Sequence, residues 1–229
     1  MLNLRLLAAK IRTRVHDAGF LGAIRLTAKQ SVKILKSSTS APDEFDSKHG
    51  TDTAGSANLW RYQIASTNAQ HGAFYGTQTE RHIRVLLDPI PREVIFLDLG
   101  CGKGRPLMIA AEMQFQTIIG VEFVRELADI ARNNLRKTAT RATVLDGDAA
   151  IFEFPSGPLA VYLYNPFAAA VMSPVVRRLR SHEGDLWVVY VNPRHAALFD
   201  EWMNREPLKL AQAEVFAPES VAIWHGRKQ

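Results

Sequence analysis

The chain has very little cysteine: Cys101 is the single thiol in 229 residues. One thiol excludes an intramolecular disulfide and any cysteine-rich metal site. The histidine and acidic residues also lack a spacing typical of metal ligands, so we predict no metal site. Because the absence of disulfides is usual in a reducing compartment, we expect a cytoplasmic protein.

Long apolar runs are absent too. Nowhere does the sequence contain the roughly 18 consecutive apolar residues that a membrane-spanning helix needs. No clean apolar run is followed by a small-residue cleavage site, which argues against a signal peptide. With 47% hydrophobic residues, the chain is instead long enough to bury one large apolar core.

The formal net charge of +5 is unevenly distributed along the chain. Residues 1–36 contain eight Lys or Arg residues and one acid, whereas the rest of the chain has 20 basic and 22 acidic residues. Apolar residues recur at helical spacing in this segment, which predicts a basic, amphipathic helical extension. The extension either packs on the main domain as a helical cap or binds an anionic partner, such as a membrane surface or a nucleic acid.

Residues 37–58 are polar and show no apolar period, and we interpret them as a linker or a loop on the substrate side. The main domain is assigned to residues 59–229. From Glu93 onward, short β-branched runs alternate with helical stretches, which is typical of βαβ units around a mainly parallel sheet. Seven strands are predicted, at residues 94–99, 117–121, 142–145, 159–164, 186–191, 208–216 and 220–225.

The last two predicted strands are separated only by a turn at Pro218, so they should form an antiparallel hairpin. The fold class that follows is α/β. We predict a Rossmann-like, doubly wound and mainly parallel seven-stranded sheet with a C-terminal antiparallel hairpin, preceded by the helical extension.

A glycine-rich turn follows the first of these strands, in the segment Asp98-Leu-Gly-Cys-Gly-Lys-Gly104. Gly100, Gly102 and Gly104 allow the backbone to turn sharply and to approach a ligand closely. Arg105 stands where a dinucleotide-binding turn needs a small residue. The carboxylate of Asp98 would repel a pyrophosphate but attract the cationic amino-acid end of S-adenosylmethionine. We therefore predict a binding site for S-adenosylmethionine rather than for NAD.

Acidic residues also follow the next two strands. Glu122 ends the second strand, where a carboxylate can accept hydrogen bonds from both ribose hydroxyls. The alternative for Glu122 is a solvent-exposed strand end. Phe123 can lie against the adenine ring. In the loop after the third strand we prefer Asp148 to Asp146 as the acceptor for the adenine amino group.

Three segments together resemble the first three motifs of class I S-adenosylmethionine-dependent methyltransferases: 98–104, 120–122 and 147–149. The resemblance implies S-adenosylmethionine as the cofactor. Upstream, Tyr75-Gly-Thr-Gln-Thr79 is similar to a Tyr-x-Pro-Thr/Ser segment of the seven-strand protein lysine methyltransferases. That likeness implies that Tyr75 and Thr77 line the methionine end of the cofactor. The alternative for Thr77 is a helix N-cap.

Asn165, Pro166 and Phe167 follow the fourth strand, at the end of the sheet where ligands bind in such folds. Asn165 and the Pro166 carbonyl can accept hydrogen bonds from an amine, and Phe167 can pack on a flat group. The segment resembles the Asn-Pro-Pro-Tyr/Phe motif of methyltransferases that modify planar amines and glutamine amides. We predict these three residues as catalytic, the alternative being an ordinary Asn-Pro turn.

The expected function is methyl transfer to a nitrogen on a protein side chain, with lysine favoured over glutamine. Two other enzymes stay open, a small-molecule methyltransferase and a nucleic-acid methyltransferase. The mildly acidic main domain argues against broad phosphate contact, while the basic extension argues for it. A regulatory protein that binds the cofactor without turnover is the alternative from a different class.

Overall fold

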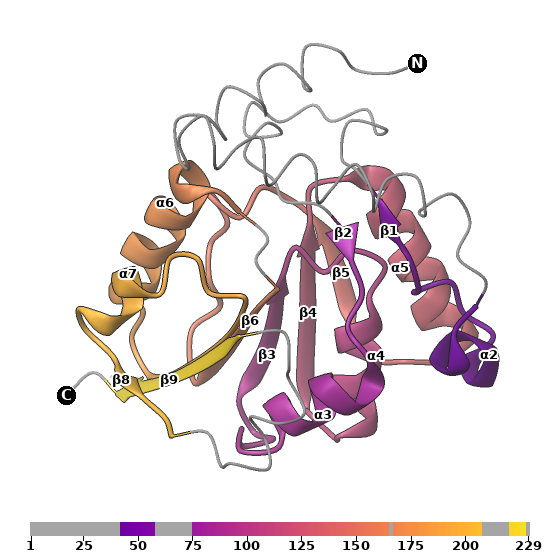
Figure 1. Cartoon of the computed structure of the whole chain (residues 1–229), viewed down its shortest axis with the longest axis horizontal. Helices are drawn as coiled ribbons and strands as arrows, with labels where there is room; N and C mark the ends of the chain where they lie inside the picture. The colour runs from indigo at the N-terminus through magenta and orange to yellow at the C-terminus, as the bar shows by residue number, and fades with distance from the viewer. Residues whose placement is uncertain (1–41, 58–74, 165–166, 208–219, 228–229) are drawn as a thin grey trace.

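A computed structural model describes residues 42–57, 75–164, 167–207 and 220–227. Its centre is a seven-stranded sheet in the order β5-β4-β3-β6-β7-β9-β8 (Figure 1). The first five strands in this order are parallel, and β9 runs antiparallel to both β7 and β8. The strands are β3 (Ile95–Leu99), β4 (Thr117–Glu122), β5 (Thr143–Asp146), β6 (Leu159–Tyr164), β7 (Asp185–Val191), β8 (Asn204–Arg205) and β9 (Val221–Arg227).

Helices lie on both faces of the sheet (Figure 1). On one face, α3 (Glu80–Leu87), α4 (Arg105–Glu112) and α5 (Arg125–Lys137) pack apolar side chains against alternate residues of β3, such as Phe96. On the other face, α6 (Ala169–Arg180) and α7 (Ala197–Asp200) pack against the residues between them, such as Leu97 and Leu99. Because both faces are covered, the central strands read as continuous apolar runs rather than as alternating ones.

The order of strands reverses between β3 and β6, which lie side by side although β4 and β5 come between them in the sequence. In an open α/β sheet, ligands bind at such a switch point, beyond the carboxyl ends of the strands. The described sheet therefore has the predicted Rossmann-like, doubly wound form, with antiparallel strands at the C-terminal edge. The loops after β3, β4, β5 and β6 are where a site is expected.

The structure departs from the prediction at two places. The edge strand β8, which is sixth along the chain among the strands of this sheet, is only two residues long. It lies at Asn204–Arg205, where no strand was predicted. The segment 37–58 contains a short helix, α2 (Glu44–His49), and a strand, β1 (Ser56–Ala57), which pairs with β2 (Tyr75–Gly76). Helix α2 was missed because polar contacts hold this segment, so no apolar period marks it.

Other predictions fall outside the described residues. These are the helical extension at 1–36, the strand at 208–216, the turn at Pro218, and both Asn165 and Pro166. Within the described part of the chain, no helix combines the length and the apolarity that crossing a bilayer requires.

Candidate functional site

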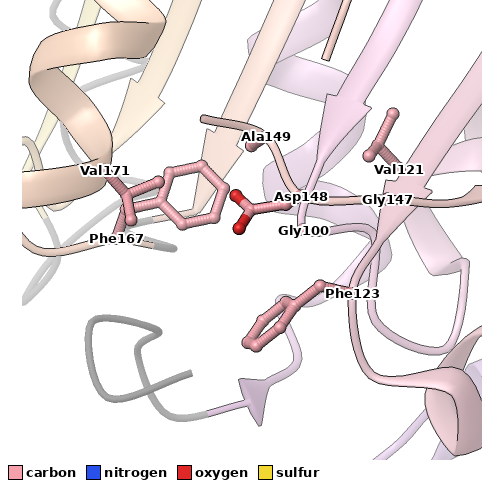
Figure 2. Close-up of a pocket in the computed structure, with 8 residues that line it drawn as sticks. All are labelled: Gly100, Val121, Phe123, Gly147, Asp148, Ala149, Phe167 and Val171. Atoms are coloured by element: carbon pink, nitrogen blue, oxygen red, sulfur yellow. The ribbon is translucent and has the colours of Figure 1, made fainter. Parts of the chain in front are cut away.

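A pocket opens beyond the carboxyl ends of β3, β4 and β5, with about 310 Å³ of empty space (Figure 2). That volume includes space that is open to solvent. Its wall is mostly apolar, and one acid projects into it. The lining residues are Gly100, Val121, Phe123, Gly147, Asp148, Ala149, Phe167 and Val171.

The glycine turn has the backbone conformation that its residue types suggest. Gly100, Gly102 and Gly104 have φ angles of +83°, +55° and +86°, a region that residues with a Cβ atom rarely adopt. The amide of Gly100 donates to the Val121 carbonyl at 2.8 Å, which joins the start of the turn to the end of β4. The turn thus brings bare backbone to the edge of the pocket.

The buried carboxylate of Glu122 holds the same turn from the other side. Its Oε2 accepts a hydrogen bond from the Gly102 amide at 2.8 Å, and its Oε1 accepts one from the Val124 amide at 2.9 Å. Burial raises the pKa of Glu122 from 4.5 to about 7, although these hydrogen bonds act in the opposite direction. With 4% of its surface exposed, Glu122 is not the solvent-exposed strand end considered as the alternative.

Asp98 is the most unusual polar group of the site. It lies in β3, only 2% exposed, and its Oδ2 atom has no hydrogen-bond partner among the described residues. Burial raises the pKa of Asp98 well above its ordinary value, and the nearby Glu122 carboxylate raises it further. A buried carboxyl oxygen without a partner is costly for the fold. A cationic ligand group placed beside it would relieve that cost, so the site fits the ammonium of S-adenosylmethionine.

Phe123, Asp148 and Phe167 point into the pocket from three separate loops (Figure 2). Asp148 Oδ1 also accepts a hydrogen bond from the Ala150 amide at 2.9 Å, which orients the carboxylate. The competing residue, Asp146, is instead paired with Arg132 at 2.6 Å and does not line the pocket. The geometry therefore favours Asp148 over Asp146 as a ligand-facing acid.

Phe167 was predicted on the acceptor side, and the structure brings it next to the residues predicted for the cofactor. It is buried and shares the pocket wall with Gly100 and Phe123. The other two predicted catalytic residues, Asn165 and Pro166, lie outside the described residues. Phe167 thus belongs to the wall between the pocket and α6.

The segment before α3 differs from its prediction in detail. Thr79, not Thr77, is the N-cap of α3, and its hydroxyl accepts a hydrogen bond from the His82 amide. The N-cap alternative for Thr77 is therefore wrong. The Thr77 hydroxyl donates to the Thr53 carbonyl at 2.7 Å and contacts that of Gly55 at 3.2 Å. Tyr75 lies in β2, which pairs with β1.

Sequence reasoning missed a buried polar pair beside the glycine turn. The hydroxyl of Tyr162 in β6 donates a hydrogen bond to the side-chain oxygen of Gln78, and both residues are buried. Arg105, considered only for its size, is 3% exposed and contacts residues 27 or more positions earlier in the chain. No local pattern marks contacts over such sequence separations. In the described part of the chain, no three His, Cys, Asp or Glu side chains are grouped as metal ligands would be.

Comparison with known proteins agrees with the type of site. Residues 96–182 match a family model described as a methyltransferase domain. Among curated proteins, a protein-L-isoaspartate O-methyltransferase of Methanopyrus kandleri is 35% identical over 114 residues, which are 48% of this chain and 49% of that protein. Nocamycin O-methyltransferase of Saccharothrix syringae is 33% identical over 164 residues, which cover 64% of this chain and 54% of that protein. The chain thus spans about half the length of these relatives.

Solved structures to which this chain is similar have a lower sequence identity to it than these two curated relatives. An RNA methyltransferase of Salinibacter ruber, in complex with S-adenosyl-L-homocysteine, is 17% identical, with a TM-score of 0.49 over 67% of this chain and 95% of the other. The predicted methyltransferase domain is confirmed by the family match over residues 96–182, and the strand order agrees with the predicted Rossmann-like fold. The particular resemblance to lysine methyltransferases is not confirmed.

Proposed function

We propose that this chain transfers a methyl group from S-adenosylmethionine to an acceptor, since residues 96–182 match a methyltransferase domain. One observation supports the proposal most strongly. Asp98 in β3 and Glu122 at the end of β4 are two buried carboxyl groups that interact electrostatically, and one oxygen of Asp98 has no hydrogen-bond partner among the described residues. Glu122 holds the glycine turn, whose first residue, Gly100, lines an apolar pocket. Two buried carboxyl groups close together are unfavourable alone but fit a ligand that brings a positive charge.

The described residues divide the binding task between them. Asp98 would receive the ammonium group of the amino-acid end, and Glu122 would accept hydrogen bonds from the ribose hydroxyls. Phe123 would pack on the adenine ring, and Asp148 would accept from the adenine amino group. When bound, the cofactor supplies a methyl group on a positively charged sulfur. The protein then has to align an uncharged nucleophile and exclude water, for which no metal and no covalent intermediate is needed.

For the acceptor, we propose a nitrogen on a protein side chain, with lysine favoured over glutamine. Asn165 and Pro166 follow β6 in the sequence, and the next residue in the sequence, Phe167, lines the pocket. The Asn165 side-chain oxygen and the Pro166 carbonyl would accept hydrogen bonds from an amine. Both oxygens are uncharged, so they orient the nucleophile without favouring its protonated, unreactive form.

A second candidate is methyl transfer to oxygen. It is favoured by the two curated relatives, both of which are named as O-methyltransferases. A carboxyl acceptor and an amine acceptor give products of different stability, because methyl esters hydrolyse in mild base and methylated amines do not.

The test uses cell extract and S-adenosylmethionine labelled in the methyl group. Protein-bound label that survives mild base and is recovered as methyl-lysine would support the favoured proposal, whereas base-labile label would support a methyl ester. Asn165→Ala should abolish labelling while keeping cofactor affinity, and Asn133→Ala on the exposed face of α5 is the matched control. Cofactor binding without labelling in any extract would favour the regulatory protein.

A further inference from the structure

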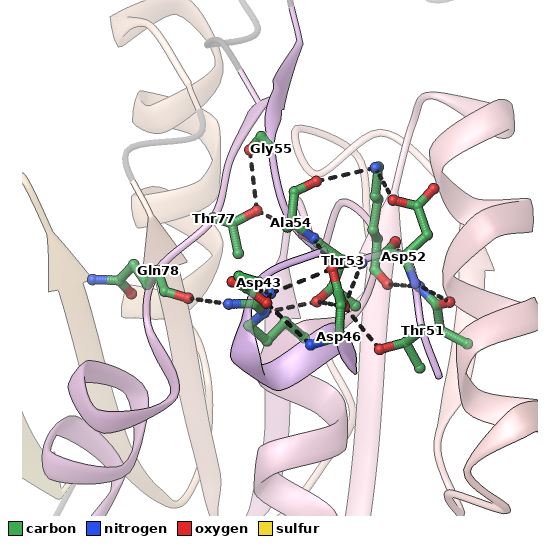
Figure 3. A network of polar contacts seen from close by, with 12 residues as sticks. Asp43, Asp46, Thr51, Asp52, Thr53, Ala54, Gly55, Thr77 and Gln78 are labelled. Carbon is green, nitrogen blue, oxygen red and sulfur yellow. Dashed lines mark hydrogen bonds and ion pairs between the residues drawn. The ribbon is translucent and has the colours of Figure 1, made fainter. Parts of the chain in front are cut away.

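The polar segment 43–54 folds around one buried carboxylate, that of Asp46 (Figure 3). This carboxylate accepts hydrogen bonds from the Thr51 and Thr53 hydroxyls and from the Thr53 and Ala54 amides, at 2.6–2.9 Å. Burial raises the pKa of Asp46, but the hydrogen bonds outweigh burial and lower it below its ordinary value. Asp46 is therefore ionised at neutral pH and closes residues 43–54 into a compact unit, which we call the brace.

The brace grips Arg105, the residue that directly follows the glycine turn. Arg105 Nε donates to the Thr53 hydroxyl at 2.7 Å, and its Nη2 atom lies 2.8 Å from the Asp43 carboxylate and 3.7 Å from that of Asp46. The guanidinium group also lies over the Phe45 ring, 4.7 Å from its centre. The Thr53 hydroxyl thus links the two residues, because it accepts a hydrogen bond from Arg105 and donates one to Asp46.

A second set of contacts holds Lys103, inside the turn. Its ammonium group lies 2.6 Å from the Asp52 carboxylate and 3.2 Å from the Ala54 carbonyl. The side-chain amide of Asn134 in α5 donates to the carbonyls of Asp52 and Lys103. The turn is therefore held on two sides. Lys103 in the turn and Arg105 directly after it contact the brace, and Gly102 contacts Glu122.

The same arginine connects the brace to the acceptor side of the sheet. Arg105 Nη1 donates to the Gln78 carbonyl at 3.0 Å, and the Gln78 side chain accepts from the Tyr162 hydroxyl. Tyr162 is paired with Asp98 across the sheet and precedes Asn165 by three residues. Contacts thus run continuously from the brace, through the residue after the glycine turn, to the strand that ends at the proposed acceptor site.

Stability alone does not account for this arrangement. A buried ion pair contributes little net stability, because removing two charges from water costs about as much as their attraction returns. Such a pair can instead fix the relative positions of the segments that it joins. Glycine has the greatest backbone freedom of all residues, so a glycine turn gains most from being held in one conformation. Neither these brace contacts, Asp46, Thr53 and Arg105, nor the buried carboxyl groups of Asp98 and Glu122 line the pocket of Figure 2, whose wall includes Gly100 at the start of the turn.

We propose that Asp46, Thr53 and Arg105 are positioning residues that hold the glycine turn in its cofactor-binding geometry, so that cofactor affinity depends on the brace. This inference rests on the proposed function, since it concerns the same cofactor site. The brace acts through the turn and not by touching the ligand. Loosening it therefore weakens binding by letting residues 100–104 sample other conformations.

The experiment removes a single hydroxyl without changing shape. Thr53→Val deletes the oxygen between Arg105 and Asp46, whereas Thr53→Ser keeps it and is the matched control. Affinity for S-adenosyl-L-homocysteine is measured by calorimetry, and amide hydrogen exchange is followed in residues 99–105. We expect Thr53→Val to bind about tenfold more weakly, equivalent to about 1.4 kcal/mol, with faster exchange in the turn. Thr53→Ser should stay within about twofold of the unaltered protein.

A second variant guards against loss of folding. Lys103→Met removes the contact of the ammonium group with Asp52 and should weaken binding about threefold. Arg180 ends α6, away from the glycine turn, and forms an ion pair with Glu201. Arg180→Gln removes this ion pair and should leave cofactor affinity unchanged. Lower thermal stability with unchanged affinity in Thr53→Val and Lys103→Met would overturn the inference and leave the proposed function standing. Failure of the unaltered protein to bind would overturn both.

Discussion

The two buried carboxyl groups make a specific prediction about pH, centred on Glu122. Its pKa of about 7 in the folded protein lies above the ordinary value of 4.5. Between these two values the folded state binds a proton that the unfolded state has already lost. The free energy of unfolding without cofactor should therefore fall as pH rises from 4.5 to 7, by up to about 3 kcal/mol from this group.

Cofactor affinity should change with pH in the opposite direction. Ribose hydroxyls donate hydrogen bonds to the ionised carboxylate, so binding requires Glu122 without its proton. With a pKa of about 7, the ionised fraction is about eightfold larger at pH 7.5 than at pH 6. The affinity for S-adenosyl-L-homocysteine should rise by about this factor.

Glu122→Gln separates this account from a general effect of pH on the protein. The neutral amide keeps the shape but places an NH₂ group against the amide of Gly102 or Val124, where the carboxylate accepts. Leaving one buried donor unpaired costs about 1–3 kcal/mol. We expect weaker binding at pH 8 and nearly constant affinity from pH 6 to 8. Glu126→Gln on the exposed face of α5 is the control and should keep the original profile. A pH dependence that persists in Glu122→Gln would refute the reasoning.

Three further substitutions test the site and the packing behind it. Asp98→Asn should weaken S-adenosylmethionine binding more than tenfold, about 1.4 kcal/mol. It should also raise thermal stability at pH 8, because burial disfavours the carboxylate, whose pKa it raises, but carries no such penalty of charge for an amide. Unchanged affinity would contradict the proposed role of Asp98. Gly120→Ala would place a Cβ atom 2.7 Å from the Cys101 sulfur, and it should lower the free energy of unfolding, measured by chemical denaturation, by about 1–3 kcal/mol. Gly226→Ala is the control, because its Cβ atom would lie 3.6 Å from its nearest neighbour, and it should lower the free energy of unfolding clearly less. Phe123→Ala should weaken binding of S-adenosyl-L-homocysteine more than that of homocysteine alone, because only the former has an adenine ring to stack; equal losses would place the ring elsewhere.

Much of the fold could be predicted from the sequence because its main signals are local. The buried strands from 94 to 191 are short β-branched runs between helical stretches, and all five occur in the structure within about two residues of their predicted ends. The glycine turn and the acid at the end of β4 are likewise separated by one strand and one helix. Their contact, from Gly102 to Glu122, follows from the parallel pairing of β3 and β4.

The parts that could not be predicted depend on contacts between distant residues. The six residues of α2 are held by the carboxylate of Asp46 and by Arg105, and Arg105 is 62 positions from its partner Asp43. A strand of two residues, such as β8, is too short to show an alternation of apolar and polar residues from which it could be predicted. The place of Phe167 in the pocket wall depends on how the loop after β6 approaches Phe123, which residue type alone does not determine.

The most direct test of the account is calorimetric titration of the purified protein with S-adenosylmethionine, S-adenosyl-L-homocysteine and NAD. We expect one site per chain with micromolar affinity for the first two compounds and no heat with NAD. Binding of NAD, or absence of binding by both S-adenosyl compounds, would contradict the assignment of this pocket to the methyl donor.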